Sequence, residues 1–270
     1  MSSSKVRHDR RRALYASTAW LVGPLLPMNS TLARALVDPA DPAITALSAQ
    51  LVQGIATPRE RAVAIHDHVR DAVAFGYTAH AYALSAADVN AARIGYSLTK
   101  STLFVALLRA AGIEARQQFA DLDARVLHGL VDFHTPYVDH STTEVLLGGA
   151  WVPTDSYVVD RALSEPAHRA LAASGGRLGF GVQADGTCDW DGRAPAYAQF
   201  DPRHSRVRWG AFRDAAAFYQ AIPEAWNRQT PTTRVTFPLA AVTANEAANT
   251  LRARGAPAHA QGRREPGRHR

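Results

Sequence analysis

The sequence predicts an α+β fold, because it contains a buried helix, a strand that follows this helix, and a β-hairpin further along the chain. Residues 103–108 are apolar on every face, which at helical length predicts a helix that is buried on all sides. This central helix is expected to end at Ala111 and Gly112, and residues 113–120 have the pattern of a strand. Two β-rich runs over 141–155, joined by a Gly-Gly pair, predict the hairpin.

Ser97 lies in the first turn of the central helix, directly after Gly95 and Tyr96. Unpaired backbone N–H groups and the positive end of the helix dipole converge at such a position. An enzyme can place a nucleophile and an oxyanion pocket there. Serine is also among the best N-cap residues, so a purely capping role for Ser97 is the simpler alternative on this stretch alone.

The predicted hairpin places an acid beside a histidine. A two-residue glycine turn pairs Leu147 with Ala150, so that Thr142 faces Asp155 further down the strands. His140 then lies on the same face as Asp155 and diagonal to it. Diagonal neighbours are ~7–8 Å apart at the backbone, which allows an imidazole–carboxylate hydrogen bond. This prediction requires the strand to extend back to His140.

The composition limits the classes of function. With 270 residues and 47% hydrophobic content, the chain can bury one substantial core. Residues 1–12 carry a net charge of +4 and residues 251–270 a net charge of +5, so the +6 of the whole chain leaves −3 for the central body. A mildly acidic body gives no support to nucleic-acid binding, and the basic ends are expected to be solvated. Cys188 is the only cysteine, which excludes an intrachain disulfide and a multi-cysteine zinc site.

Residues 1–36 are expected to form an N-terminal extension, either helical or an export signal. Three arginines at 10–12 precede a moderately apolar stretch, as in an export signal, but Gly23, Pro24 and Pro27 interrupt that stretch. It is also too short and broken to span a membrane. We therefore expect a helical extension and a cytoplasmic protein, with export as the alternative.

Residues 37–250 are predicted to form the folded domain, with a lid-like insertion at about 160–205, and residues 251–270 a disordered basic tail. Thr57, Pro58 and Glu60 form a strong helix-start signal. The insertion is expected to consist of loops and short strands around Trp190. The other expected elements are short helices over 42–55 and 212–222, a helix from 58 to about 75, a further helix within 237–254, and an irregular stretch from 77 to 90.

Two further residue types carry no clear chemistry. His66 and His68 lie two residues apart on the helix predicted after Thr57, so they point in different directions and cannot share a metal ion from one face. Both are expected at the surface. Cys188 lies in a turn-like, glycine-containing stretch without a motif and is interpreted as incidental.

Four segments together resemble the transglutaminase-like superfamily, which includes papain-like and arylamine-acyltransferase relatives. Its pattern is a glycine, one residue and a nucleophilic cysteine, then an apolar helix that ends in Leu-Leu-Arg-Ala-x-Gly-Ile-x-Ala-Arg. A histidine that leads to Glu-Val-x-Leu, a glycine turn, Trp-Val and an aspartate follow. The matching segments are Gly95-Tyr96-Ser97, residues 107–116, His140 with residues 144–147, and residues 148–155.

The resemblance covers about residues 57–160. It implies a central helix packed on an antiparallel sheet, with the nucleophile at the N-terminus of the helix and the histidine and aspartate on neighbouring strands. The implied catalytic residues are Ser97, His140 and Asp155. The implied activity is acyl transfer by a hydrolase, an acyltransferase or an acyl-cyclising enzyme, as in natural-product pathways of bacterial relatives.

The sequence departs from the family at the nucleophile, where Ser97 stands in place of cysteine. The family relies on a thiolate–imidazolium pair, and a hydroxyl does not ionise in that way. Ser97 can act only if His140 takes its proton during attack, with Asp155 holding the imidazole. Three interpretations follow: a working serine acyl-transfer enzyme, an inactive relative that acts as a binding module, or a cysteine enzyme whose nucleophile has been changed to serine.

Two rival sites rank lower. Ser97 and Lys100 fit the Ser-x-x-Lys motif of penicillin-recognising enzymes, but the partner motifs of that class are absent, and a structural role for Lys100 is preferred. His128, His134 and Asp132 lie close in sequence to His140 without a diagnostic metal-ligand spacing. The sequence thus predicts no cofactor and no metal, and a small-molecule, acyl or peptidyl substrate as the partner.

Overall fold

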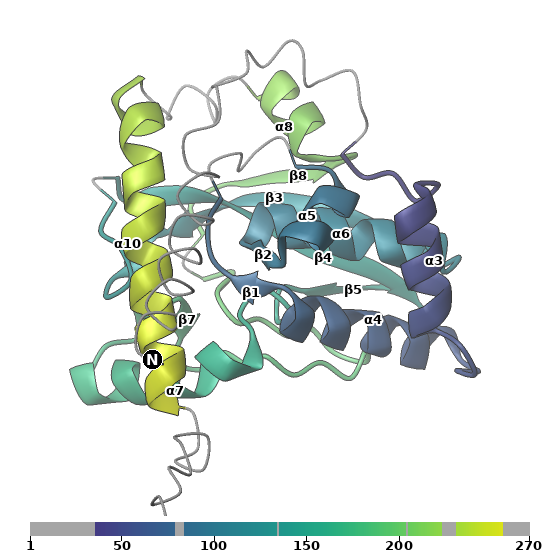
Figure 1. Cartoon of the computed structure of the whole chain (residues 1–270), viewed down its shortest axis with the longest axis horizontal. Helices are drawn as coiled ribbons and strands as arrows, with labels where there is room; N and C mark the ends of the chain where they lie inside the picture. Colours follow the sequence, from purple (N-terminus) through teal and green to yellow (C-terminus); the bar gives the residue numbers. More distant parts are fainter. Residues whose placement is uncertain (1–35, 79–83, 134, 204, 223–230, 256–270) are drawn as a thin grey trace, which may run out of the picture.

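The computed structural model describes residues 36–78, 84–133, 135–203, 205–222 and 231–255, with the backbone alone over 231–238 (Figure 1). Nearly all of the expected N-terminal extension, residues 1–35, lies outside the described residues. Leu36 is buried in the core, and its carbonyl accepts a hydrogen bond from the Ala86 N–H.

The centre of the fold is helix α6 (Ser97–Ala110), which is buried over twelve consecutive residues from Ser97 to Leu108. A four-stranded antiparallel sheet packs against it, in the order β5-β4-β3-β8. The α+β fold class and the central helix are therefore confirmed. The strands are β3 (Ala115–Asp123), β4 (Tyr137–Leu147), β5 (Ala150–Thr154) and β8 (Arg208–Phe212).

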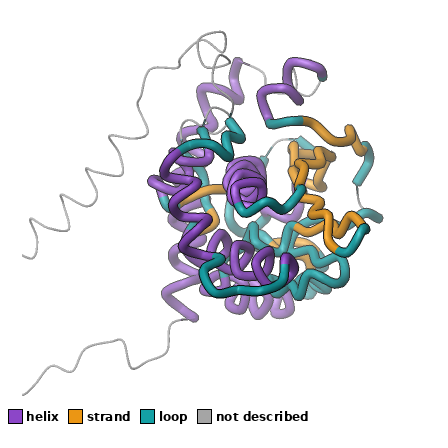
Figure 2. The backbone as a smooth tube through the Cα atoms, turned by 90° about the vertical axis from the view of Figure 1, so that its right-hand side faces the viewer, coloured by secondary structure: helices purple, strands orange, loops and turns teal. Residues whose placement is uncertain are grey.

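Three helices cover the side of α6 that the sheet leaves open, and all of them contact it. Figure 2 shows a helix end-on near the centre of the molecule, with strands to one side of it and helices to the other. The covering helices are α3 (Pro42–Leu51), α4 (Pro58–Ala72) and α5 (Ala86–Ala92). This enclosure explains why the 103–108 run has no polar face.

The remaining elements surround this core. Helix α10 lies along one side of the molecule and packs on α7 (Figure 1). The strands β1 and β2 form a two-stranded parallel pair that leads directly into α6. These elements are α7 (Arg161–Ser174), α8 (Ala215–Ala221), α10 (Pro231–Gly255), the 3-10 helix η1 (Ala124–Leu127), and the strands β1 (Ala74–Phe75), β2 (Ile94–Gly95), β6 (Leu178–Gly179) and β7 (Val182–Gln183).

The local signals in the sequence proved accurate at two positions. The side chain of Thr57 accepts a hydrogen bond from the backbone N–H of Glu60, and the Glu60 carboxylate accepts one from that of Thr57, which completes the capping box of α4. The hairpin has the predicted register, with Leu147 opposite Ala150. Strand β4 begins at Tyr137 and thus includes His140, as the predicted pairing required.

The structure corrects three predictions. Residues 161–174, expected within loops, form helix α7, capped by Asp160 and continued through Pro166. The helix expected from Phe212 begins later, because residues 208–212 pair with β3 as strand β8. The stretch from 77 to 90 was expected to be irregular, but Ser85 caps helix α5 within it. Pro166 interrupts the periodic pattern of α7, whereas β8 and α5 are only five and seven residues long and contain too few repeats to be recognised.

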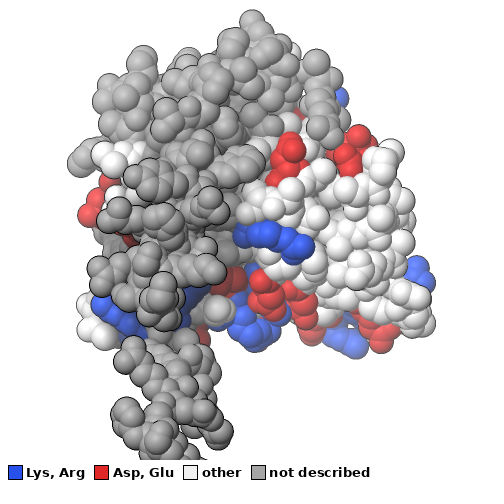
Figure 3. All heavy atoms as spheres, in the orientation of Figure 1, with Lys and Arg blue, Asp and Glu red and all other residues white. Residues whose placement is uncertain are grey.

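The C-terminal helix extends past the predicted start of the tail. Residues 251–255 continue α10, where Leu251 is buried and the Arg252 guanidinium donates to the Asp160 carboxylate. On the described part of the face in Figure 3, acidic and basic side chains are interspersed. Among the described residues, none of the helices is both long and apolar enough to cross a membrane.

The substitution Thr57→Ala removes the capping box of α4 and is expected to lower the free energy of unfolding by about 1 kcal/mol. The measurement is urea denaturation followed by circular dichroism. Thr250→Ala is the matched control, because Thr250 is an exposed residue in the interior of α10, and it should change stability by less than about 0.5 kcal/mol. Equal effects of the two substitutions would contradict the role of the cap.

Candidate active site

The structure joins the two residues that the hairpin was predicted to bring together. His140 on β4 and Asp155, directly after β5, form a hydrogen bond of 2.8 Å between Nε2 and Oδ2. Both side chains are almost completely buried, with exposed fractions of 1% and 0%. Because an ionised carboxylate can only accept, Nε2 of His140 is the donor.

Three backbone N–H groups also hold the Asp155 carboxylate. Those of Ala198 and Gln199 donate to Oδ1, at 2.5 and 3.4 Å, and that of Phe200 donates to Oδ2 at 2.8 Å. Burial of a carboxylate is costly unless hydrogen bonds replace its water, and here four donors do so. Segment 198–200 therefore fixes the acid. No motif marks this segment in the sequence, and it was not predicted to belong to the site.

The His140 ring is held in one orientation, and only one of its two nitrogens forms a hydrogen bond. The ring of Phe200 stacks on the imidazole, with centroids 5.9 Å apart and an angle of 5° between the planes. In the described part of the chain, Nδ1 of His140 is buried and has no hydrogen-bond partner. In a neutral ring whose Nε2 carries the proton, Nδ1 has a free lone pair and is able to accept a proton.

Ser97 is buried at the first position of α6, with Tyr96 as the N-cap residue. The Tyr96 N–H donates to Thr99 Oγ1 at 3.0 Å, which fixes the entry of the chain into the helix. No hydrogen bond joins the side chains of Ser97 and His140, both of which the structure describes. Catalytic hydrogen bonds are often long in enzymes without substrate, so the missing bond does not by itself exclude Ser97 and His140 as a catalytic pair.

A buried polar network ties the start of α6 to the strand that carries His140. Ser101, one turn after Ser97, lies 2.9 Å from Ser141 between the two hydroxyl oxygens, and Ser141 is the neighbour of His140. Gln117 on β3 donates to Ser101 Oγ at 2.5 Å. These contacts fix α6 and β4 relative to one another at the candidate site.

Residues 45–156 match a family model described as the transglutaminase-like superfamily. This part of the chain is a transglutaminase-like domain. The matched residues include Ser97, His140 and Asp155, and end one residue after the aspartate. No curated protein matches the chain.

Two solved structures are similar to the chain. One is a candidate cysteine protease from Cytophaga hutchinsonii, with 18% identity and a TM-score of 0.40, over 65% of this chain and 43% of that one. The other is a candidate protease from Parabacteroides distasonis, with 16% identity and a TM-score of 0.34, over 47% of this chain and 25% of that one. The chain spans less than half the length of either structure.

Lys100 of the transglutaminase-like domain has contacts that support the predicted structural role. Its side chain is completely buried, and Nζ donates to the carbonyl oxygens of Val73 at 2.6 Å and Arg70 at 3.2 Å. These carbonyls belong to the C-terminal end of α4, which Lys100 therefore ties to α6. Burial lowers the pKa of Lys100 from its ordinary value of 10.5 to about 7.

His66 is the main residue that sequence analysis misplaced, because it was expected at the surface and is completely buried. Its Nε2 lies 2.8 Å from Ser156 Oγ, and its Nδ1 lies 2.9 Å from an oxygen of the Asp67 carboxylate. The signal was present, because Ala62, His66 and Val69 follow the spacing of one buried helix face. His68 is partly buried.

The structure adds no support for a metal site at His128, Asp132 and His134, and it shows no chemical role for Cys188. The side chains of His128 and Asp132 are exposed and 3.7 Å apart, and His134 lies outside the described residues. No group of three or more potential metal ligands is present in the described ranges. Cys188 is buried, and its carbonyl accepts a hydrogen bond from Arg70.

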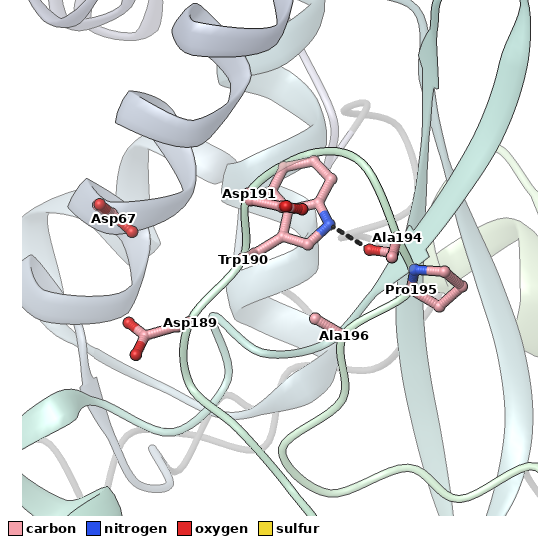
Figure 4. Close-up of a pocket in the computed structure, with 7 residues that line it drawn as sticks. All are labelled: Asp67, Asp189, Trp190, Asp191, Ala194, Pro195 and Ala196. Atoms are coloured by element: carbon pink, nitrogen blue, oxygen red, sulfur yellow. Dashed lines mark hydrogen bonds between the residues drawn. The ribbon is translucent and has the colours of Figure 1, made fainter.

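A hollow of about 360 Å³ is lined by Trp190 and its neighbours, and Ser97, His140 and Asp155 are not among its lining residues (Figure 4). Trp190 forms its wall, donates from its indole N–H to the Ala194 carbonyl at 3.1 Å, and packs 5.4 Å from the His66 ring. The residues that line it are Asp67, Asp189, Trp190, Asp191, Ala194, Pro195 and Ala196.

The substitution Lys100→Met tests how the buried amine affects stability. Above pH 7 the folded protein holds Lys100 neutral while the unfolded chain keeps it protonated, so unfolding takes up a proton. The free energy of unfolding should therefore rise from pH 7 to pH 9, with a contribution of up to ~1.4 kcal/mol per pH unit from this residue. Urea denaturation at several pH values measures it. In Lys100→Met the contribution should vanish, and parallel curves for the two proteins would contradict the assignment.

Proposed function

We propose that the protein is an acyl-transfer enzyme in which Ser97 is the nucleophile, His140 the general base and Asp155 the residue that orients the base. The observation that carries this proposal is the buried His140–Asp155 pair, whose Nδ1 has no partner in the described part of the chain. The position of Ser97 at the N-terminus of α6 and the match to the transglutaminase-like family support it.

The reaction proceeds in two halves. His140 Nδ1 takes the proton of the Ser97 hydroxyl while Oγ attacks the substrate carbonyl, since the hydroxyl does not ionise alone. The first-turn N–H groups of α6 stabilise the oxyanion of the tetrahedral intermediate. The imidazolium then gives its proton to the leaving group, which leaves an acyl-enzyme. An acceptor that is water, an amine or a carbon nucleophile attacks the acyl-enzyme while His140 takes up its proton. The bond between the acyl carbon and Ser97 Oγ then breaks, and the imidazolium returns a proton to the serine.

The finer assignments are proposals of the same kind. A hydrolase, an acyltransferase and an acyl-cyclising enzyme share this first half-reaction and differ only in the acceptor. A role in natural-product biosynthesis and a cytoplasmic location follow from the sequence expectations. The partner is a small-molecule, acyl or peptidyl substrate.

The second candidate function is a binding module without covalent chemistry. The observation that favours it is the serine at the position where the family resemblance expects cysteine, because a hydroxyl does not form the thiolate–imidazolium pair. In this alternative the domain binds a ligand without reacting with it, and the polar network around Ser101 only maintains the packing of α6 on β4.

Incubation with an activated ester, followed by intact-protein mass spectrometry, tests the proposed function. We expect one acyl adduct, located on Ser97 by peptide mapping, and no adduct in Ser97→Ala. Ser48→Ala is the matched control, because Ser48 is an equally buried serine that donates to Leu107 near the far end of α6. An adduct that persists in Ser97→Ala, or the absence of any adduct, would contradict the proposal.

The substitution Ser97→Cys tests whether the site is adapted to a hydroxyl or to a thiolate. If His140 and Asp155 act on the native serine as general base and orienting group, the cysteine variant should acylate no more than about tenfold faster, since general-base catalysis contributes ~10²–10⁴-fold to the serine. The measurement is the acylation rate with the same ester. A gain much larger than this would favour a cysteine enzyme whose nucleophile has been changed.

A further inference from the structure

The two residues on either side of Asp155 carry hydroxyl groups that contact each other. Thr154 Oγ1 lies 2.7 Å from Ser156 Oγ, and the Ser156 N–H donates to Thr154 Oγ1 at 3.2 Å. All three residues are completely buried. The hydroxyl pair thus fixes the backbone immediately before and after the residue that orients His140.

This hydroxyl pair is the middle of a hydrogen-bond chain that has an acceptor at each end. From Ser156 Oγ the chain continues to His66 Nε2 at 2.8 Å, and from His66 Nδ1 to the Asp67 carboxylate at 2.9 Å. In the other direction, Thr154 Oγ1 donates to the carbonyl oxygen of Ala196 at 2.9 Å. Both end residues, Asp67 and Ala196, line the hollow next to Trp190 in Figure 4.

The Ala196 carbonyl connects this chain to the candidate active site. The same oxygen accepts the backbone N–H of Asp155 at 3.1 Å, and Ala196 forms a parallel β-bridge with Thr154. Two residues later begins segment 198–200, whose N–H groups hold the Asp155 carboxylate. Backbone contacts therefore link Ala196 directly to Asp155 and to the segment that holds its carboxylate.

The number of protons in the chain depends on His66. The four hydrogen bonds need four protons, but a neutral imidazole and two hydroxyls supply only three. In the neutral ring, Nδ1 keeps its proton and donates it in the hydrogen bond to the Asp67 carboxylate, so Ser156 must donate to Nε2. Thr154 then has one proton for two acceptors, Ser156 Oγ and the Ala196 carbonyl oxygen. An imidazolium supplies the fourth proton, so that Ser156 donates to Thr154 and Thr154 donates to Ala196.

The groups around His66 have opposing effects on the protonation of its ring. Asp67, on the same helix, favours the charged ring, whereas Arg70 and the Lys100 ammonium of α6 disfavour it. The Tyr157 phenol ring lies 6.1 Å away, and the rings of Phe104 and Trp190 complete the enclosure. Burial is the largest effect and lowers the pKa of His66 below its ordinary value of 6.5.

We propose that His66 is a positioning residue for Asp155, and that protonation of its imidazole completes the hydrogen-bond chain and fixes the Ala196 carbonyl. At neutral pH the Thr154 proton is shared between Ser156 and Ala196, and in acid it is committed to Ala196. The proposal deepens the proposed function, on which it rests for the catalytic meaning of Asp155, but the hydrogen-bond chain itself is testable without a substrate.

The experiment follows two NMR signals of histidine-labelled protein as the pH is lowered. One is the low-field Nε2 proton of His140, which reports its hydrogen bond to Asp155 and is assigned with His140→Gln. The other is the ring of His66, assigned with His66→Gln. In the native protein we expect the chemical shift of the His140 proton to change at the pH where the His66 ring titrates. This change, which follows the titration of another residue, is called the second inflection.

Two substitutions at one position distinguish the hydrogen-bond chain from general packing. Thr154→Val keeps the shape but removes the hydroxyl and should abolish the second inflection, whereas Thr154→Ser keeps the hydroxyl and should retain it. Ser156→Ala should also abolish it, and the buried Ser48→Ala should leave it unchanged. Near-UV circular dichroism verifies that each variant is folded.

The proposal is overturned if the second inflection persists in Thr154→Val, if it is lost equally in Thr154→Ser, or if the His66 ring stays neutral down to the acid-unfolding midpoint. A protein that fails to acylate Ser97 but shows the coupled titration would refute the proposed function alone. A protein that acylates Ser97 without the coupling would refute only the role of His66.

Discussion

The hydrogen bond between His140 and Asp155 is the interaction on which the rest of the site depends. A carboxylate without exposed surface is strongly disfavoured unless donors surround it, and Asp155 receives one from the imidazole and three from backbone N–H groups of residues 198–200. Satisfying this one charge therefore requires strand β4, the end of β5 and a segment more than forty residues later in the chain to adopt one fixed arrangement.

The need to satisfy buried polar groups also determines the contacts of the first two turns of α6. A helix that is buried from Ser97 to Leu108 must satisfy every polar side chain inside the protein. Ser101 does so through Ser141 and Gln117, and Lys100 through the carbonyls at the end of α4. Each of these bonds ties α6 to a different neighbour, so the N-terminus of the helix is fixed relative to β3, β4 and α4 together.

The sequence predicted the features that depend on neighbouring residues and failed where distant segments meet. The glycine turn determined the hairpin register, and this register was sufficient to pair His140 with Asp155. The capping box at Thr57 is equally local. In contrast, the partner of His66 is Ser156, ninety residues away, and the donors to Asp155 are backbone groups that any sequence supplies. Such contacts follow from the tertiary fold, and no spacing along the chain reveals them.

His140 is more informative about chemistry than Asp155. The carboxylate accepts three backbone N–H groups, so a protein without catalytic activity would keep Asp155 for stability alone. His140 supplies the fourth donor to this carboxylate, but in the described part of the chain its buried Nδ1 has no partner. An unpaired buried polar atom costs ~1–3 kcal/mol, but Nε2 of His68 and Nε2 of His168 are also buried without a partner in the described ranges, so this feature alone does not mark a catalytic residue. What distinguishes His140 is that its other nitrogen donates to a buried carboxylate, the arrangement that orients a general base, and this pairing is the physical reason to propose a catalytic role for it.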